Sequence, residues 1–180
     1  MSAPHTFIRP EILWQTIGLK AGQTVIHLGC GPGFYLIPAA KIVGPSGKAI
    51  GVDIRPDMVA EAASRATREG VGTIVQTIHA NGEDMKPANL PEGSADWVLL
   101  VNILHQSHPA KVIGEARQLM KPAGHVIVIS WSTAATPFGP PLDNRLSVSE
   151  MNDILTAAKL KVVKNFTPSP YHYGLIAAPL

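Results

Sequence analysis

A short apolar run that stops at three closely spaced glycines constrains this chain more than any other feature. Residues 24–28 are mostly β-branched or apolar, and glycines in G-x-G-x-G spacing follow directly. Such a run is typical of a buried strand, and such glycines of a tight turn whose backbone can approach a ligand closely. A second apolar run, residues 49–52, ends in Asp53, twenty residues after the last glycine. The two runs predict neighbouring strands, the second with a carboxylate at its tip.

The position of Asp53 predicts the kind of ligand. A carboxylate at a strand tip can accept hydrogen bonds from the two vicinal hydroxyls of a ribose, so we expect a cofactor that contains adenosine. The dinucleotide fingerprint G-x-G-x-x-G requires glycine where this chain has Phe34. The Gly-Lys-Ser/Thr sequence of an ATP-binding P-loop occurs nowhere in the chain. A dinucleotide and ATP are therefore both disfavoured.

Strand-like and helix-like segments alternate along almost the whole chain, which is typical of a doubly wound sheet. The predicted strands are residues 24–28, 48–52, 73–79, 96–101 and 125–131. The predicted helices are residues 9–17, 34–43, 57–69, 109–120 and 147–159, the last with a capping box at Ser147 and Glu150. Residues 161–166 and 173–177 predict a hairpin. We therefore expect one α/β domain over residues 1–180, Rossmann-like, with a mostly parallel seven-stranded sheet and a C-terminal antiparallel hairpin.

Composition restricts the partners and the compartment. The 180 residues carry a formal net charge of +2 at pH 7, which favours neither nucleic acid nor a membrane surface as a partner. Cys30 is the single cysteine, so a disulfide within the chain is excluded and a reducing, cytoplasmic setting is expected. Residues 1–6 lack the features of a signal peptide, and no apolar run is long enough to cross a bilayer.

The glycine turn followed by Phe34-Tyr35-Leu36 resembles motif I of the class I methyltransferases that depend on S-adenosylmethionine (SAM). The resemblance covers residues 9–177, because the order of predicted elements is that of the family and residues 119–125 are similar to the turn before its fifth strand. Within this superfamily the chain resembles the small methyltransferases of the UbiE-like and arsenite-methyltransferase-like group, of methyltransferase type 11/25. The resemblance implies a transferase with SAM as its cofactor. It leaves the acceptor open, because a fold does not determine a reaction.

The resemblance also implies a set of cofactor residues at the carboxyl ends of strands, where open α/β sheets bind ligands. They are Gly29, Cys30, Gly31, Gly33, Asp53, Ile54, Met58, Asn81, Gly82, Glu83 and Asn102. The glycines would approach the methionine part and the ribose, and Asp53 would hold the ribose hydroxyls. Ile54 and Met58 would flank the adenine, although both are equally compatible with an ordinary core. Gly82 and Glu83 would offer backbone N–H groups to the ring.

Two positions depart from the family pattern. Asn81 stands where an acidic residue usually meets the adenine amino group, and its amide oxygen accepts a hydrogen bond without the help of a charge. His27 stands where an acid helps to hold the ammonium group of the methionine part. A charged imidazole there would oppose binding, whereas a neutral one accepts a single hydrogen bond. His27 either weakens SAM binding, is compensated elsewhere, or is a core histidine.

Candidate residues for the chemistry follow later strands. Methyl transfer needs a general base only if the acceptor must lose a proton of high pKa. His105, after the fourth predicted strand, is the candidate base, with a role in packing as the alternative. Tyr171, His172, Tyr173 and Arg145 are candidates for an acceptor pocket, because an antiparallel last strand would begin at the edge that carries the glycine turn. Aromatic packing of the hairpin is the alternative for the three hairpin residues.

Several acceptors and activities are disfavoured. The chain lacks the clustered cysteines expected of an arsenic methyltransferase, and its seven histidines lack zinc-ligand spacing, so no metal site is expected. No large insertion or basic stripe decorates the predicted core, which favours a small-molecule acceptor. We expect a monomer or a homodimer. A SAM- or nucleotide-binding protein without transferase activity is the alternative, motivated by His27 and Asn81. A Rossmann oxidoreductase ranks third because of Phe34.

Overall fold

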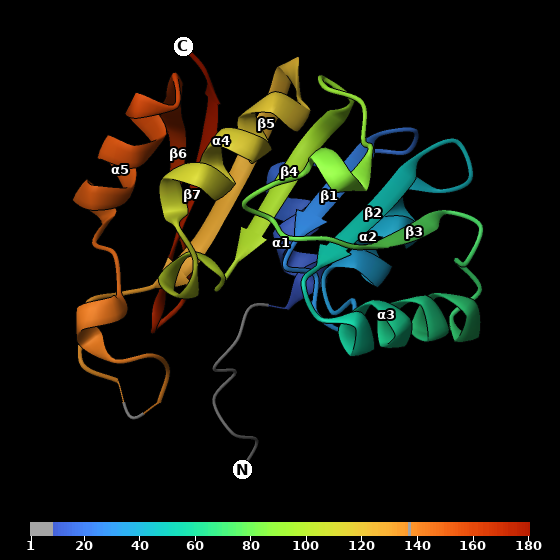
Figure 1. Ribbon diagram of the computed structural model, residues 1–180, viewed down its shortest axis with the longest axis horizontal. Coiled ribbons are helices and arrows are strands. Elements are labelled where there is room, and N and C mark those ends of the chain that lie inside the picture. Colours follow the sequence, from blue (N-terminus) through green and yellow to red (C-terminus); the bar gives the residue numbers. More distant parts are fainter. Residues whose placement is uncertain (1–8, 137) are drawn as a thin grey trace.

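The computed structural model describes residues 9–136 and 138–180, and the strands of this part form one seven-stranded sheet (Figure 1). The strands are β1 (Thr24–Leu28), β2 (Lys48–Asp53), β3 (Val75–His79), β4 (Ala95–Val101), β5 (Met120–Trp131), β6 (Leu160–Ser169) and β7 (His172–Pro179). Their order is β3-β2-β1-β4-β5-β7-β6. Strands β1 to β5 are parallel, and β7 is antiparallel to both β5 and β6. The predicted α/β sheet with a C-terminal antiparallel hairpin is confirmed.

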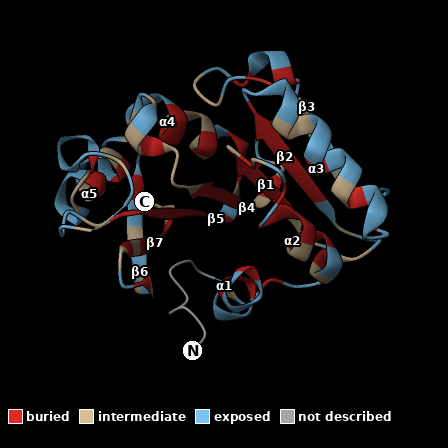
Figure 2. Cartoon of the chain, turned by 90° about the horizontal axis from the view of Figure 1, so that it is seen from below, coloured by how far each residue is buried: buried red, intermediate tan, exposed pale blue. Residues whose placement is uncertain are grey.

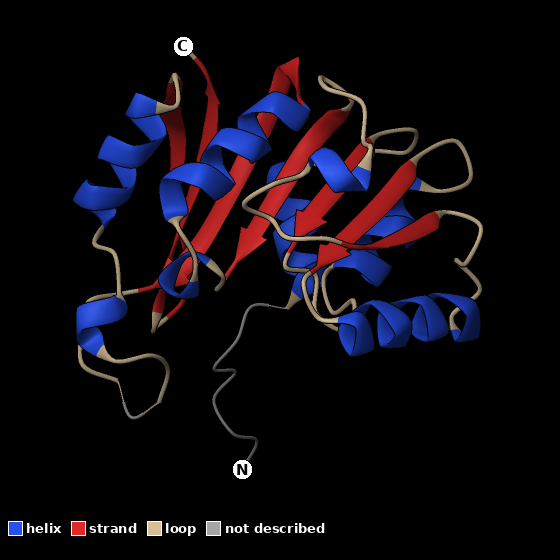
Figure 3. Ribbon diagram, in the orientation of Figure 1, coloured by secondary structure: helices blue, strands red, loops and turns tan. Residues whose placement is uncertain are grey.

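Helices cover both faces of this sheet (Figure 3). They are α1 (Pro10–Ile17), α2 (Leu36–Val43), α3 (Pro56–Arg68), α4 (Pro109–Leu119) and α5 (Val148–Ala157), with short 3-10 turns η1 (Lys86–Ala88), η2 (Leu104–Gln106) and η3 (Leu142–Asn144). Because side chains alternate along a strand, Ile26 and Leu28 of β1 pack in the core under α4 and α5, whereas Val25 packs in the core under α1 and α2. Figure 2 shows the buried strands between these two helical layers.

Strand β5 begins five residues earlier than predicted. Residues 121–124 were expected to form a turn, but β5 runs through them, and Met120 already pairs with Ala95. Gly124 allows this close approach, because a Cβ there would lie 2.7 Å from the carbonyl oxygen of Ala95. The register between β4 and β5 shifts between Ala95 and Trp97, which accommodates the early start of β5. The sequence pattern could not predict it, because it depends on the neighbouring strand.

The hairpin is also longer than predicted, with β6 reaching Ser169 and β7 beginning at His172. Pro168 is tolerated because β6 is an edge strand, and the register shifts between Phe166 and Ser169. The capping box of α5 is confirmed: Ser147 Oγ accepts a hydrogen bond from the Glu150 N–H at 3.2 Å, and the Glu150 carboxylate accepts one from the Ser147 N–H at 2.8 Å.

The signal-peptide prediction concerns residues 1–6, which lie outside the described residues, as does Pro137. Within residues 9–136 and 138–180, no helix combines the length and the apolar character needed to span a membrane.

Candidate functional site

A cavity of about 520 Å³ lies at the carboxyl ends of β1 to β4. Strands β1 and β4 are parallel neighbours, but the chain leaves β1 towards α2 on one face and β4 towards α4 on the other, which opens a crevice between their ends. The cavity is lined by Gly29, Gly31, Val52, Asp53, Ile54, Arg55, Met58, Ala80, Asn81, Gly82, Glu83, Val101, Asn102, Ile103, Gln106, Ser107 and Val112. Its volume is typical of a site for a ligand of cofactor size.

The glycine turn after β1 forms one wall of this cavity. Gly29, Gly31 and Gly33 have φ values of +73°, +51° and +83°, a region that other residues rarely adopt. A Cβ on Gly29 would collide with Cγ2 of Ile103, whereas a Cβ on Gly31 would meet no atom of the described chain within 4 Å. Gly29 therefore allows the loop after β4 to pack closely, and Gly31 leaves its face of the cavity open to a ligand.

The carboxylate of Asp53 is held at the tip of β2 by two backbone groups. Oδ2 accepts a hydrogen bond from the Gly31 N–H at 2.8 Å, and Oδ1 accepts one from the Arg55 N–H at 3.0 Å. The side chain of Arg55 pairs with Asp57 instead. Because each carboxylate oxygen has two lone pairs, one on each remains for a ligand. Asp53 lines the cavity and is 9% exposed, so it is positioned to accept two hydroxyl groups there.

The loop after β3 forms the opposite rim. Asn81 Oδ1 accepts a hydrogen bond from the Glu83 N–H at 2.9 Å. The prediction that Glu83 offers its N–H to a ring is therefore not supported by this conformation, and Gly82 is left for that role. The Glu83 carboxylate accepts hydrogen bonds from the His108 N–H at 2.9 Å and from its Nδ1 at 2.8 Å, and these bonds lower the pKa of Glu83. Glu83 thereby joins this rim to the start of α4.

All the predicted cofactor residues except Cys30 and Gly33 line the cavity. Gly33 instead packs against the helices, since a Cβ there would lie 3.3 Å from Ile37 and 3.4 Å from Ala62. The Cys30 thiol is buried behind the turn against Gly51, and burial followed by the charge of Asp53 raises its pKa to about 12. Both residues support the turn from behind.

Among the cavity-lining residues that sequence reasoning missed are Gln106 of η2, Ser107 directly after it, and Val112 of α4. Their only signal was that they follow a strand end, which every residue of such a connection shares.

His27 lies outside the cavity, packed edge-on against Tyr35 with ring centroids 5.9 Å apart. Neither ring nitrogen of His27 has a hydrogen-bond partner in the described part of the chain. Burial lowers the pKa of His27 to about 3. His27 is a neutral core histidine.

Three of the four predicted acceptor residues, Arg145, Tyr171 and His172, gather around Trp131 at the end of β5. This Trp131 cluster consists of Trp131, Phe138, Arg145, Tyr171 and His172. The Trp131 ring lies 4.2 Å from the ring of His172 and 6.0 Å from that of Phe138, and the Arg145 guanidinium lies 5.4 Å from its centroid. The Tyr171 ring packs against Phe138 at 5.0 Å. The sequence predicted that Arg145, Tyr171 and His172 lie at one edge of the sheet. It did not identify Trp131 as the residue around which they pack.

Arg145 is 7% exposed and holds the loop after β5. Its guanidinium donates hydrogen bonds to the carbonyl oxygens of residues 132, 134, 138 and 140 and to Thr136 Oγ1. All its nitrogens are therefore engaged by the chain itself. Tyr173 is likewise engaged, since its hydroxyl donates to the Leu146 carbonyl oxygen at 3.0 Å. Neither residue lines the cavity.

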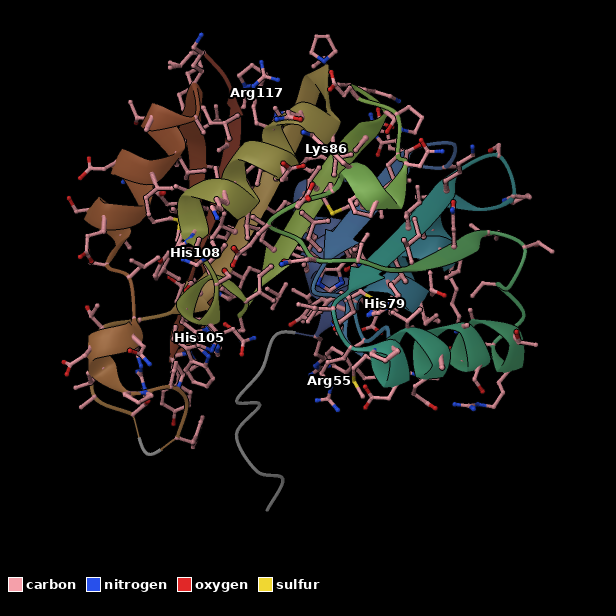
Figure 4. All side chains as sticks on the ribbon, in the orientation of Figure 1. Arg55, His79, Lys86, His105, His108 and Arg117 are labelled. Carbon is pink, nitrogen blue, oxygen red and sulfur yellow. The ribbon has the colours of Figure 1, made fainter. Side chains whose placement is uncertain are left out.

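His105 lies at the carboxyl edge, apart from Arg55 and His79 (Figure 4). Burial and the nearby charge of Arg145 lower its pKa, so its imidazole is neutral near pH 7. Its Nδ1 is buried and has no hydrogen-bond partner among the described residues. His105 does not line the cavity, but the next residue, Gln106, does.

These features are those of an α/β domain with a cavity suited to a nucleoside cofactor at its topological switch point. SAM fits the site, because Asp53 has lone pairs free for the ribose hydroxyls and the open face of Gly31 leaves room beside them. A family model described as "Methyltransferase domain" matches residues 19–165. The chain belongs to the class I SAM-dependent methyltransferases, and its cofactor is SAM.

Individual relatives agree with this assignment. Nocamycin O-methyltransferase of Saccharothrix syringae is 35% identical over 124 residues, covering 67% of this chain and 42% of that protein. The UbiE C-methyltransferase of Hahella chejuensis is 25% identical over 121 residues, covering 67% of this chain and 47% of that protein. The chain thus spans less than half the length of these curated relatives. A SAM-dependent methyltransferase from Aquifex aeolicus has a solved structure with a TM-score of 0.88 at 28% identity, covering 98% of this chain and 92% of that one.

Proposed function

We propose that this protein transfers the methyl group of SAM to a small-molecule acceptor. The observation that carries the proposal is the doubly anchored carboxylate of Asp53, which faces the same cavity as the open backbone of Gly31. The relative named nocamycin O-methyltransferase supports a small-molecule acceptor. The low net charge of +2 supports it too, because it gives no electrostatic reason to expect a nucleic acid acceptor.

We assign the cofactor contacts as follows. Asp53 accepts hydrogen bonds from the ribose hydroxyls, and Gly29 and Gly31 let the backbone approach the sugar and the methionine part. Ile54 and Met58 flank the adenine, and the rim that carries Asn81, Gly82 and Glu83 meets its polar edge. Asn102 lies at the methionine end. When bound, SAM supplies a methyl group made electrophilic by its sulfonium. The surrounding residues orient it and exclude water.

We propose that His105 is the general base when the acceptor is a hydroxyl or an amine. In that case the His105 imidazole would take the proton of the acceptor as the acceptor atom gains the methyl group and the sulfur of SAM keeps the electrons of the broken bond. A base must be unprotonated to accept this proton, and the burial that lowers the pKa of His105 keeps it so at neutral pH. The Trp131 cluster would form the acceptor side of the site.

We infer that residues 1–180 act as one domain, since the described strands form a single sheet. We further infer a monomer or homodimer working in the cytoplasm. The buried, unpaired thiol of Cys30 is consistent with a reducing compartment.

Calorimetry with SAM, S-adenosylhomocysteine and NAD, followed by a transfer assay, tests the proposal. We expect binding of SAM and S-adenosylhomocysteine but not of NAD. SAM labelled with tritium on its methyl group is then incubated with a cell extract divided by ultrafiltration. Label in the small-molecule fraction supports the proposal, and label only in protein or nucleic acid contradicts the acceptor class. If SAM binds and no label moves, the result favours the alternative, a SAM-binding protein without transferase activity.

A further inference from the structure

The loop that closes the cavity beside Gly29 begins with a residue in an unusual conformation. Asn102 has φ +53°, and its N–H donates a hydrogen bond to the Ile129 carbonyl oxygen at 2.9 Å. Residues other than glycine adopt this left-handed region at a cost, so the surrounding structure has to hold them there. Asn102, Ile103, Gln106 and Ser107 all line the cavity. The conformation of Asn102 therefore sets the position of one cavity wall.

This wall has little freedom to move. The Ile103 side chain occupies the space that a Cβ on Gly29 would fill. A displacement at Asn102 would carry Ile103 with it, either into the glycine turn or away from it. Such a displacement changes the width of the cavity at the glycine turn, where the cofactor lies under the proposed function.

The side chain of His172 holds Asn102 from the C-terminal hairpin. Nε2 of His172 lies 3.1 Å from Nδ2 of Asn102, and Nδ1 lies 2.7 Å from Ser169 Oγ, which also accepts a hydrogen bond from the Tyr171 N–H at 3.1 Å. The ring is 4% exposed and packs on Trp131. Both ring nitrogens are thus engaged, and packing fixes the plane of the ring. The histidine is a rigid link between β7 and the loop after β4.

We propose that His172 is a positioning residue for the cofactor: through the amide of Asn102 it holds the loop of residues 102–107 in the geometry that binds SAM. The inference rests on the proposed function, because it assigns a further residue to the same site. His172 itself does not line the cavity, so it acts on the cofactor through Asn102. The residue lies 70 positions further along the chain than Asn102.

Two substitutions of His172 separate this role from simple packing. His172→Phe keeps an aromatic ring on Trp131 and removes both hydrogen bonds. His172→Gln loses the ring but keeps an amide group that can reach Asn102. Because His172→Phe loses the hydrogen bond to Asn102, and with it the support of the loop, as well as the bond to Ser169, we expect it to weaken SAM binding about tenfold or more. His172→Gln should stay within about threefold of the wild type. A residue that only packs would give the opposite order.

A double-mutant cycle with Asn102→Gly completes the test. Glycine adopts a positive φ freely, so this variant keeps the backbone conformation accessible and removes only the amide. His172→Phe combined with Asn102→Gly should bind SAM no more weakly than Asn102→Gly alone, because both changes remove one contact. Additive losses, or unchanged SAM affinity in His172→Phe, would overturn the proposal. Thermal melts show which variants fold. If His172→Phe does not fold, His172→Gln carries the test, and SAM binding weakened about tenfold or more in a folded His172→Gln would overturn the proposal. Absence of SAM binding by the wild-type protein would instead refute the proposed function.

Discussion

The carboxylate of Asp53 and the N–H of Gly31 are joined by a 2.8 Å hydrogen bond that ties the tip of β2 to the glycine turn after β1. The second carboxylate oxygen accepts the Arg55 N–H at the start of α3. Asp53 thus organises the two connections that form this side of the cavity, besides being positioned to hold the ribose. Under the proposed function, structure and cofactor binding therefore depend on the same four lone pairs of this carboxylate.

The first prediction concerns the chemistry of this carboxylate. Asp53→Asn presents an NH2 group to one of two backbone N–H donors, so it loses a hydrogen bond as well as the charge. We expect Asp53→Asn to be almost as damaging as Asp53→Ala, with SAM affinity reduced about ten- to hundredfold in both, measured by calorimetry. Asp57→Asn is the matched control, because Asp57 is exposed and its side chain pairs with Arg55. Its SAM affinity should stay within about twofold of wild type, and an Asp53→Asn variant that binds equally well would contradict the assigned role.

The second prediction separates strain from steric exclusion at the glycine turn. Gly31→Ala and Gly70→Ala both place a methyl group at positive φ, at +51° and +73°, with no described atom within 4 Å of the new Cβ. Each should cost about 1 kcal/mol of stability or slightly more in chemical denaturation. Only Gly31→Ala puts its methyl group into the cavity, so only this variant should lose SAM binding. Equal SAM affinity in the two variants would show that the cofactor does not approach Gly31.

The local features of the site were predictable because they depend on short stretches of sequence. The strand before Gly29, the strand that ends in Asp53 and the capping box at Ser147 each follow from a few adjacent residues, and the structure contains all three. The early start of β5 depends on how closely Gly124 approaches Ala95, which no local pattern records. Likewise, the bond between Asn102 and His172 joins residues 70 positions apart. Long-range pairings of this kind need the sheet order before they can be inferred.

The third prediction concerns Arg145, whose guanidinium holds the loop after β5 by hydrogen bonds to four carbonyl oxygens and Thr136 Oγ1. Lysine keeps the charge but has only three donors on one nitrogen, so it cannot reach these acceptors together. Arg145→Lys should lower the free energy of unfolding by about 2–3 kcal/mol in urea denaturation. Arg68→Lys, at an exposed arginine that pairs with Glu61, should change it by less than about 0.5 kcal/mol. Similar stabilities of the two variants would rule out the holding role.

The last prediction follows from the buried imidazole of His27. Burial lowers the pKa of His27 to about 3 in the folded protein, whereas in the unfolded chain the pKa lies near the ordinary value of 6.5. Between these two pH values the unfolded state binds a proton that the folded state excludes, so the stability that depends on neutral His27 is complete above pH 6.5 and declines as the pH falls. Each pH unit in this window costs up to about 1.4 kcal/mol.

His27→Phe removes this proton linkage and also two ring nitrogens that have no partner in the described chain. We expect the variant to be more stable than wild type by about 1 kcal/mol at pH 7.5, because two desolvated polar atoms are gone. Its advantage should grow steadily as the pH falls from 6.5 to 4, which urea denaturation at several pH values measures. Tyr35→Phe is the control, since burial raises the pKa of Tyr35 to about 12 and the group does not titrate in this range. If the advantage of His27→Phe is the same at pH 7.5 and pH 4.5, His27 has a charged partner or access to solvent, and it is not a neutral core residue.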